Sequence, residues 1–108
     1  MYMASIQMNQ EMFEKVTAGQ TPVLVNFSAP WCSYCRRIDP AYERLADQYD
    51  GRLLVAKVNI DEEPALAQQE RIELVPTLVL YRSGEALGEV VAPGSKAQIE
   101  EMVEHLLK

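Results

Sequence analysis

The sequence predicts one α/β domain in which a central mixed sheet is flanked by helices. Two observations support this class. Short apolar, β-branched segments alternate with amphipathic segments along the chain, and the last two strand-like segments are joined by a short turn. The 108 residues, of which 48% are hydrophobic, suffice for one core, so we assign residues 1–108 to a single domain.

The first predicted elements are a weak strand and a short helix. We place the strand over residues 3–7 and the helix over residues 10–18, with Asn9 as its N-cap and Gly19 at its end. The helix should direct three apolar side chains toward the core, namely Met12, Phe13 and Val16.

The next segments form a strand–helix–strand unit. Residues 23–27 are apolar on both faces, which indicates a central strand, and residues 53–59 form another apolar strand. The helix between them should run from Cys32 to about Tyr49 and kink at Pro40. Such a unit pairs its strands in parallel through a right-handed crossover. In the strand over residues 53–59, the side chains expected to be mostly buried are Leu53, Leu54, Val55, Ala56 and Val58.

The remaining predicted elements are a helix, a hairpin and a final helix. The helix covers residues 61–71 with Pro64 in its first turn, and the hairpin strands cover residues 77–81 and 86–91. A capping box at residues 95–98 begins the last helix. Its apolar face consists of Ile99, Met102, Val103 and Leu106. The predicted order is therefore β-α-β-α-β-α-β-β-α.

The two cysteines stand where the central strand gives way to the long helix. Cys32 and Cys35 are separated by two residues, and Trp31, the only tryptophan, precedes them. The free N–H groups of the first helical turn, the helix dipole and nearby Arg36 and Arg37 should favour a thiolate at the first sulfur. The second sulfur follows on the same helix face, close enough for a disulfide. This arrangement suits reversible thiol–disulfide exchange.

A structural or metal-binding role for the cysteines is an alternative. Zinc prefers four ligands, whereas the chain offers two cysteines and one histidine, His105. Because His105 falls on the predicted final helix, a zinc or iron–sulfur site would require a dimer. We therefore expect no metal, and we interpret His105 as a solvated side chain near a helix C-terminus.

Charge and composition argue against several kinds of partner. The net charge of -6 disfavours binding to nucleic acid or to anionic membranes. No apolar run approaches the roughly 18 residues of a membrane span. The first residues lack the basic and apolar regions of a signal peptide. We expect a monomer in the cytoplasm, although a processed secreted form would have the same composition.

Several segments resemble the thioredoxin family, and the resemblance covers nearly the whole chain. In order, they are Phe27, Ala29-Pro30-Trp31-Cys32-x-x-Cys35, Pro40, Val-Ala-Lys-Val-Asn-Ile-Asp at residues 55–61, Val75-Pro76-Thr77-Leu78, and Gly84. Trp-Cys-x-x-Cys followed by Val-Pro-Thr is a specific combination. The resemblance implies the thioredoxin fold, with a central mixed sheet of about five strands flanked by four helices.

The resemblance also implies a reaction. Cys32 would attack a target disulfide as a thiolate, and Cys35 would then displace the reduced target, so the protein would be a protein-disulfide reductase and redox carrier. No bound cofactor is implied beyond the redox-active Cys32–Cys35 disulfide. The implied partners are disulfide-containing proteins and, as electron donor, a flavin-dependent thioredoxin reductase that draws on NADPH.

The family's site residues carry over to matching positions of this chain. The implied catalytic set is Cys32, Cys35, Asn26, Lys57 and Pro76. The implied substrate-binding set is Trp31, Ser33, Tyr34, Val75, Pro76 and Ala92. By resemblance, the Val75-Pro76 bond would be cis and would pack against the cysteines, beside a shallow groove that holds an extended peptide.

One departure from the family concerns Asn26, which stands where the family usually has a buried Asp. An amide cannot hold a proton, so we expect slower release of the reduced target than in a typical thioredoxin. In the family, the lysine at the position of Lys57 would pair with that Asp. Here Lys57 must find another carboxylate, reach solvent or lose its charge.

Other departures affect the surface around the cysteines. Ser33 and Tyr34 replace the usual Gly-Pro, Ser28 replaces a second Trp, and Ala92 replaces the usual Gly. Because the Tyr resembles glutaredoxins, a glutaredoxin-like or disulfide-exchanging relative with a higher reduction potential is an alternative. A thioredoxin-like binding module that is switched by its redox state is another. The Ala92 methyl group should alter the choice of substrate.

Overall fold

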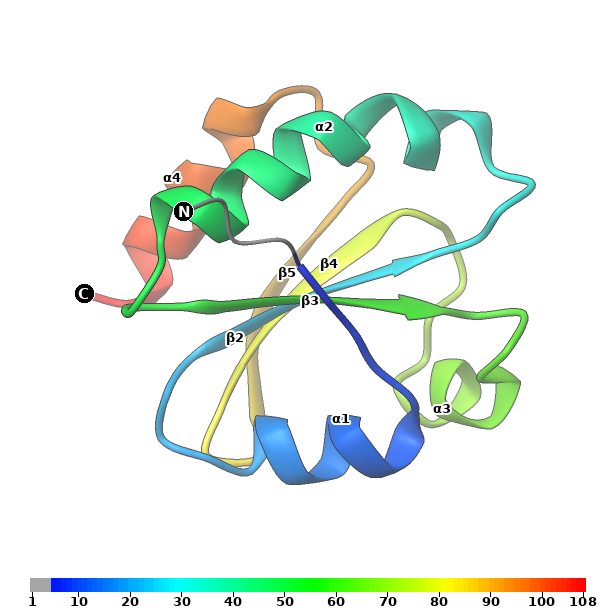
Figure 1. The fold of residues 1–108 in the computed structure, drawn as a ribbon, viewed down its shortest axis with the longest axis horizontal. Helices are drawn as coiled ribbons and strands as arrows, with labels where there is room; N and C mark the ends of the chain where they lie inside the picture. Colours follow the sequence, from blue (N-terminus) through cyan, green and yellow to red (C-terminus); the bar gives the residue numbers. More distant parts are fainter. Residues whose placement is uncertain (1–4) are drawn as a thin grey trace.

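The computed structural model describes residues 5–108, which form one five-stranded sheet between two pairs of helices. The strands are β1 (Ile6–Gln7), β2 (Val23–Ser28), β3 (Leu54–Asn59), β4 (Thr77–Arg82) and β5 (Glu85–Val91). The helices are α1 (Gln10–Thr17), α2 (Ser33–Gln48), α3 (Pro64–Gln69) and α4 (Lys96–Leu106). Helices α2 and α4 cover one face of the sheet, and α1 and α3 cover the other (Figure 1). The predicted element order is confirmed.

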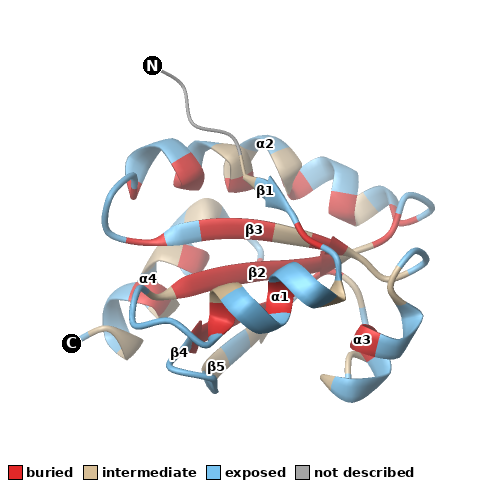
Figure 2. Ribbon diagram, turned by 60° about the horizontal axis from the view of Figure 1, so that its bottom comes forward, coloured by how far each residue is buried: buried red, intermediate tan, exposed pale blue. Residues whose placement is uncertain are grey.

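Strand β2 lies at the centre of the sheet, where both of its faces are covered. The strand order is β1-β3-β2-β4-β5, with β1, β3 and β2 parallel and with β4 and β5 antiparallel to their neighbours. Every residue of β2 except the last is buried (Figure 2). Alternation directs Leu24 toward the core beneath α2 and α4, and Val23 and Val25 toward the other core. Asn26 shares the face of Leu24, beneath α2.

Helices α1 and α4 begin at residues whose side chains accept hydrogen bonds from free N–H groups of the first turn. The Asn9 side chain accepts a hydrogen bond from the Met12 N–H at 2.9 Å, and Ser95 accepts one from Gln98 at 3.2 Å. Helix α3 is shorter than the predicted 61–71. At its start, the Asn59 side chain accepts hydrogen bonds from the backbone N–H groups of residues 61 and 62, which holds them in a turn. At its end, Arg71 has a left-handed φ of 59°, which is not helical. None of the described helices is long and apolar enough to cross a membrane.

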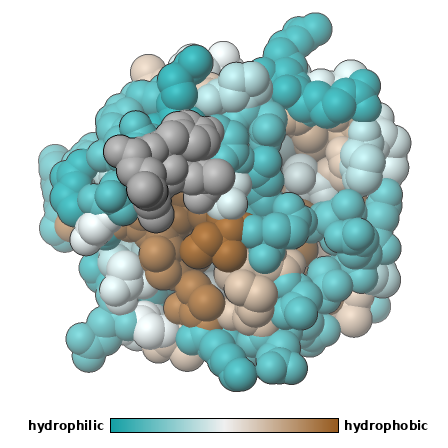
Figure 3. Space-filling model, viewed as in Figure 1, coloured by the Kyte–Doolittle hydropathy of each residue, from teal (hydrophilic) through white to brown (hydrophobic). Residues whose placement is uncertain are grey.

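Two residues predicted to be buried are partly exposed. Met12 is 38% exposed because the buried face of α1 runs through Phe13 and Thr17, one turn apart. Leu54 is 37% exposed because β1 pairs with only residues 56 and 57 of β3, so that Leu54 lies beyond the end of β1. Together with Ile6 it belongs to the β1–β3 edge, where apolar side chains gather in Figure 3. Residues 3 and 4 of the predicted first strand lie outside the described residues.

Tyr42 fixes helix α2 to the sheet. Its ring is fully buried, and its hydroxyl oxygen lies 2.8 Å from the Leu24 carbonyl of β2 and 2.6 Å from the Ala56 carbonyl of β3. Burial, above all, holds the pKa of Tyr42 well above its usual value. The hydroxyl therefore stays protonated and acts as a hydrogen-bond donor. The helix that begins at the cysteines is therefore joined to both central strands.

The Tyr42→Phe variant tests this anchor. It removes a buried donor that faces two carbonyl groups, so we expect the free energy of unfolding to fall by about 1 to 2 kcal/mol. Urea unfolding followed by circular dichroism measures the change. Tyr49→Phe is the matched control, because its hydroxyl bonds to Glu104 in a less buried position, at 2.9 Å. Equal losses in the two variants would contradict a special role for Tyr42.

Candidate active site

Cys32 occupies the N-cap of α2, as the sequence predicts. Its sulfur accepts a hydrogen bond from the Cys35 backbone N–H at 3.2 Å, so one of the free N–H groups of the first turn points at this atom. The same sulfur lies 3.7 Å from the Val75 carbonyl oxygen. Both cysteines are free thiols and are largely buried. The backbone of α2 is therefore placed to stabilise negative charge on Cys32.

Cys35 is the more deeply shielded of the two cysteines. It is 5% exposed and packs with Ala29 and Cys32 beneath the start of α2. Burial and then the hydrogen bond with Cys32 raise the pKa of Cys35 to about 11. Cys35 is therefore held as a thiol at neutral pH, which suits a second, internal nucleophile.

The loop before β4 forms the wall opposite Cys32. The Val75-Pro76 peptide bond is cis, as expected from the family resemblance. Its neighbour across the sheet is Ala92, whose backbone N–H donates to the Pro76 carbonyl at 2.9 Å. Ala92 has a φ of 46°, in the left-handed region that favours glycine. The structure thus brings Cys32, Val75, Pro76 and Ala92 together.

Tyr34 joins the start of α2 to the loop between β5 and α4. Its hydroxyl donates to the Pro93 carbonyl at 2.7 Å, while its ring is half-buried against the core. Ser33 is exposed. Of the two residues predicted to bind substrate at these positions, Ser33 is open to solvent and Tyr34 has its polar end engaged within the protein.

Exposed apolar side chains flank these loops. Trp31 is 64% exposed, and its ring N–H donates to Asp61 at 3.2 Å. Leu74 is 65% exposed directly before Val75, and Val91 is 41% exposed directly before Ala92. Sequence reasoning missed Leu74 and Val91. Each directly precedes a residue of the predicted substrate-binding set in the sequence, which could have indicated that it lies at the site. Their exposure, however, depends on the tertiary structure.

Lys57 pairs with two carboxylates of helix α2 in place of the Asp that the family has at position 26. Register places it beside Asn26, yet its ammonium group contacts Asp39 at 2.6 Å and Glu43 at 2.7 Å, both on α2. Burial alone would lower the pKa of Lys57, but the hydrogen bonds to these two carboxylates hold it above its usual value. Lys57 therefore keeps its charge by pairing with the helix.

Glu43 is held ionised by several partners. Burial alone would raise its pKa, but hydrogen bonds from Lys57 and from Ser5 hold it below its usual value. Ser5 donates to Glu43 through its backbone N–H at 2.8 Å and through its hydroxyl at 2.5 Å. The side-chain oxygen Oδ1 of Asn26, in contrast, is buried and has no hydrogen-bond partner among the described residues.

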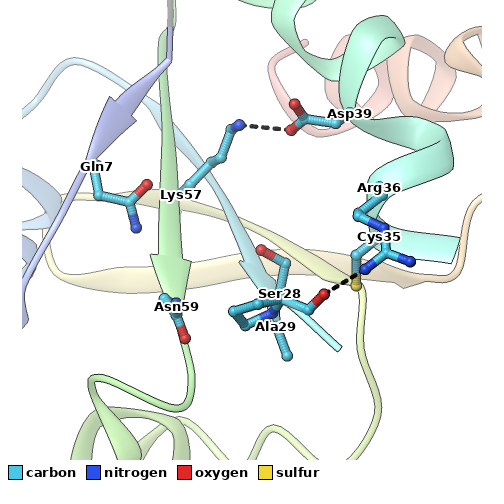
Figure 4. A pocket seen from close by; sticks show the side chains of 9 residues that line it. Gln7, Ser28, Ala29, Cys35, Arg36, Asp39, Lys57 and Asn59 are labelled. Carbon is cyan, nitrogen blue, oxygen red and sulfur yellow. Dashed lines mark hydrogen bonds and ion pairs between the residues drawn. The ribbon is translucent and has the colours of Figure 1, made fainter. Parts of the chain in front are cut away.

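A pocket of about 430 Å³, lined mostly by polar residues, opens beside Cys35, between α2 and strand β3. Figure 4 shows Cys35, Asp39 and Lys57 around it, with the Lys57 ammonium group reaching toward the Asp39 carboxylate. Arg36, which was expected to act on the thiolate, also lines this pocket, and its guanidinium donates to the Pro30 carbonyl at 2.7 Å. The remaining lining residues are Gln7, Ser28, Ala29, Pro30 and Asn59.

Known proteins resemble this chain in sequence and in fold. The model of the thioredoxin family matches residues 4–105. "Thioredoxin 1" of Nostoc sp. is 37% identical over 102 residues, which cover 94% of this chain and 95% of that protein. The chloroplastic M-type thioredoxin of Pisum sativum is 41% identical over 91 residues, which cover 84% of this chain and 53% of that protein.

A solved structure agrees with these sequence relatives. The thioredoxin of Malassezia sympodialis superimposes with a TM-score of 0.89 at 27% identity, and the match covers 100% of this chain and 96% of that one. These matches support the thioredoxin interpretation over the glutaredoxin-like and binding-module alternatives. The chain, with a Trp-Cys-x-x-Cys segment at the start of α2, belongs to the thioredoxin family.

Proposed function

We propose that this thioredoxin-family protein reduces disulfide bonds of other proteins by cycling Cys32 and Cys35 between dithiol and disulfide. The observation that carries this proposal is the sulfur of Cys32 at the helix N-cap, with the Cys35 N–H 3.2 Å away. No separate cofactor is needed, because the two sulfurs carry both electrons.

The geometry assigns a different task to each sulfur. The Cys32 thiolate attacks one sulfur of the target disulfide, and a mixed disulfide forms while the other target sulfur leaves. Cys35 then attacks Cys32, which releases the second target sulfur and leaves a Cys32–Cys35 disulfide. Because Cys35 is shielded on the inner side of the helix start, it reacts with Cys32 rather than with a second target.

The proposed partners are disulfide-containing proteins and a donor that reduces the Cys32–Cys35 disulfide. By family likeness, we propose thioredoxin reductase with NADPH as that donor. The monomeric state and the cytoplasmic location stay predictions. Trp31, Leu74 and Val91 are exposed beside the reactive loops, so they support a contact surface that recognises the apolar residues around a target disulfide.

Serine variants test the cycle. We expect Cys32→Ser to abolish reduction of insulin disulfides, because no attacking thiolate remains. Cys35→Ser should instead trap the target as a stable mixed disulfide that mass spectrometry detects. The assay runs once with NADPH and thioredoxin reductase as donor and once with glutathione. Thermal unfolding of both variants checks that the fold is kept. Turnover that persists in Cys32→Ser would refute the proposed function.

Asn26→Asp tests the effect of the neutral amide on the release step. Because Asn26 lies beneath α2 and cannot hold a proton, we expect the added carboxylate to speed release of the target at least about 10-fold. The rate is measured in a single turnover with an aromatic disulfide, dithiobis(nitrobenzoate). Its first coloured thiolate reports attack by Cys32, and its second reports displacement by Cys35. An unchanged or slower second phase would contradict the prediction.

Ala92→Gly tests the left-handed residue next to Pro76. Glycine relieves a conformation that costs other residues about 1 to 2 kcal/mol, and part of that gain is lost to unfolded-chain entropy. We expect slightly greater stability and a broader choice of substrates in a panel of peptide disulfides. Ala97→Gly, in the first turn of α4, is the matched control, and it should lower stability by up to about 1 kcal/mol, the cost of glycine in a helix interior. Identical substrate profiles for Ala92→Gly and wild type would dismiss a role for this methyl group.

A further inference from the structure

The release step poses a proton problem that the cysteines alone do not solve. Cys35 must lose its proton before it attacks Cys32, yet burial, the largest cause, raises its pKa above that of an ordinary thiol. At pH 7 only a small fraction of Cys35 is therefore a thiolate. Asn26, the polar residue beneath this part of α2, is an amide and cannot take the proton. Another group has to accept it.

The pocket beside Cys35 contains one such group among the residues that line it. Its charged side chains are Arg36 and Asp39 from α2 and Lys57 from β3, and the other polar ones are neutral. Arg36 and Lys57 are cations and have no site for a further proton. Glu43 lies one turn beyond Asp39, does not line the pocket and is occupied by Lys57 and Ser5. Asp39 is therefore the carboxylate that shares this space with Cys35.

Helix geometry places Asp39 on the same face as Cys35, four residues and about one turn away. Its oxygen Oδ1 is 2.6 Å from the Lys57 ammonium group, which holds the carboxylate at the pocket. The Asp39 side chain is 41% exposed, and the pocket is open and lined mostly by polar residues, so water can occupy the space between the carboxylate and the thiol.

We propose that Asp39 accepts the Cys35 proton through solvent in this pocket during release of the reduced target. Lys57 is a positioning residue that holds the Asp39 carboxylate. This inference rests on the disulfide-reducing cycle proposed above and adds to it the route by which the inner thiol is activated.

The step balances as follows. The Cys35 S–H bond breaks, and its proton passes through water to the Asp39 carboxylate. The Cys35 thiolate forms a bond to the Cys32 sulfur, and the bond between Cys32 and the target sulfur breaks. The target sulfur leaves with the electron pair as a thiolate and is protonated by solvent or by Asp39. Over attack and release together, the cysteine pair is oxidised by two electrons and the target disulfide is reduced by two.

The two-phase reaction with dithiobis(nitrobenzoate) tests the proposal on the whole chain. We expect Asp39→Asn to slow the second phase about 100-fold and to leave the first phase unchanged. Glu43→Gln is the matched control, because it also removes one carboxylate from Lys57 but none from the pocket, and it should keep the wild-type rates. Asp39→Glu keeps a carboxylate at the pocket and should restore most of the second phase.

The pH dependence separates proton transfer from a structural effect. In Asp39→Asn the second-phase rate should rise about tenfold per pH unit between about pH 6 and pH 9, because it follows the Cys35 thiolate fraction well below its pKa. The wild-type rate should change much less over this range. Equal slowing by Asp39→Asn and Glu43→Gln, or a wild-type pH profile in Asp39→Asn, would overturn the proposal. Loss of the first phase in the wild type would instead refute the disulfide-reducing function.

Discussion

The hydrogen bond from the Cys35 N–H to the Cys32 sulfur is the interaction on which the site depends. It exists because the first turn of a helix leaves its N–H groups without partners, and here a sulfur takes the place of the usual capping oxygen. The bond requires β2 to end just before the cysteines and α2 to begin with them. It also requires α2 to stay where it is, which the buried hydroxyl of Tyr42 secures through its contacts with β2 and β3.

The charged groups near the cysteines lie on helix α2 and on Lys57, and not on the central strand, where Asn26 is neutral. Asn26 is almost fully buried, so a carboxylate there would be costly without a close partner. In this chain the carboxylates instead come from α2, at Asp39 and Glu43, and Lys57 reaches across to them. The Asp39 side chain is partly exposed, in contrast to the buried side chain of Asn26 in the sheet. Negative charge is thus displaced from the central strand to the pocket beside Cys35.

Much of the fold could be predicted because its signals are local. The apolar run of β2, the Pro at the start of α3 and the polar caps at Asn9 and Ser95 each act on neighbouring residues. Two predictions failed where burial depends on distant elements. Met12 and Leu54 are apolar in suitable patterns, but the narrow buried face of α1 and the short β1 leave them partly exposed. The sequence likewise did not predict which carboxylates pair with Lys57, because they lie on helix α2 and Lys57 lies on strand β3.

The sequence by itself determined the alternation of strands and helices, the place of the cysteines at a helix start and, through its resemblance to the thioredoxin family, the chemistry and the cis bond before Pro76. These follow from short-range preferences and from motifs that are legible along the chain. Only the tertiary structure decided that Tyr34 binds the Pro93 carbonyl, that Leu74 and Val91 are exposed beside the reactive loops, and that Asp39 and Lys57 share a pocket with Cys35. Each of these contacts depends on the distance between residues of separate elements. Sheet register and helix packing determine that distance.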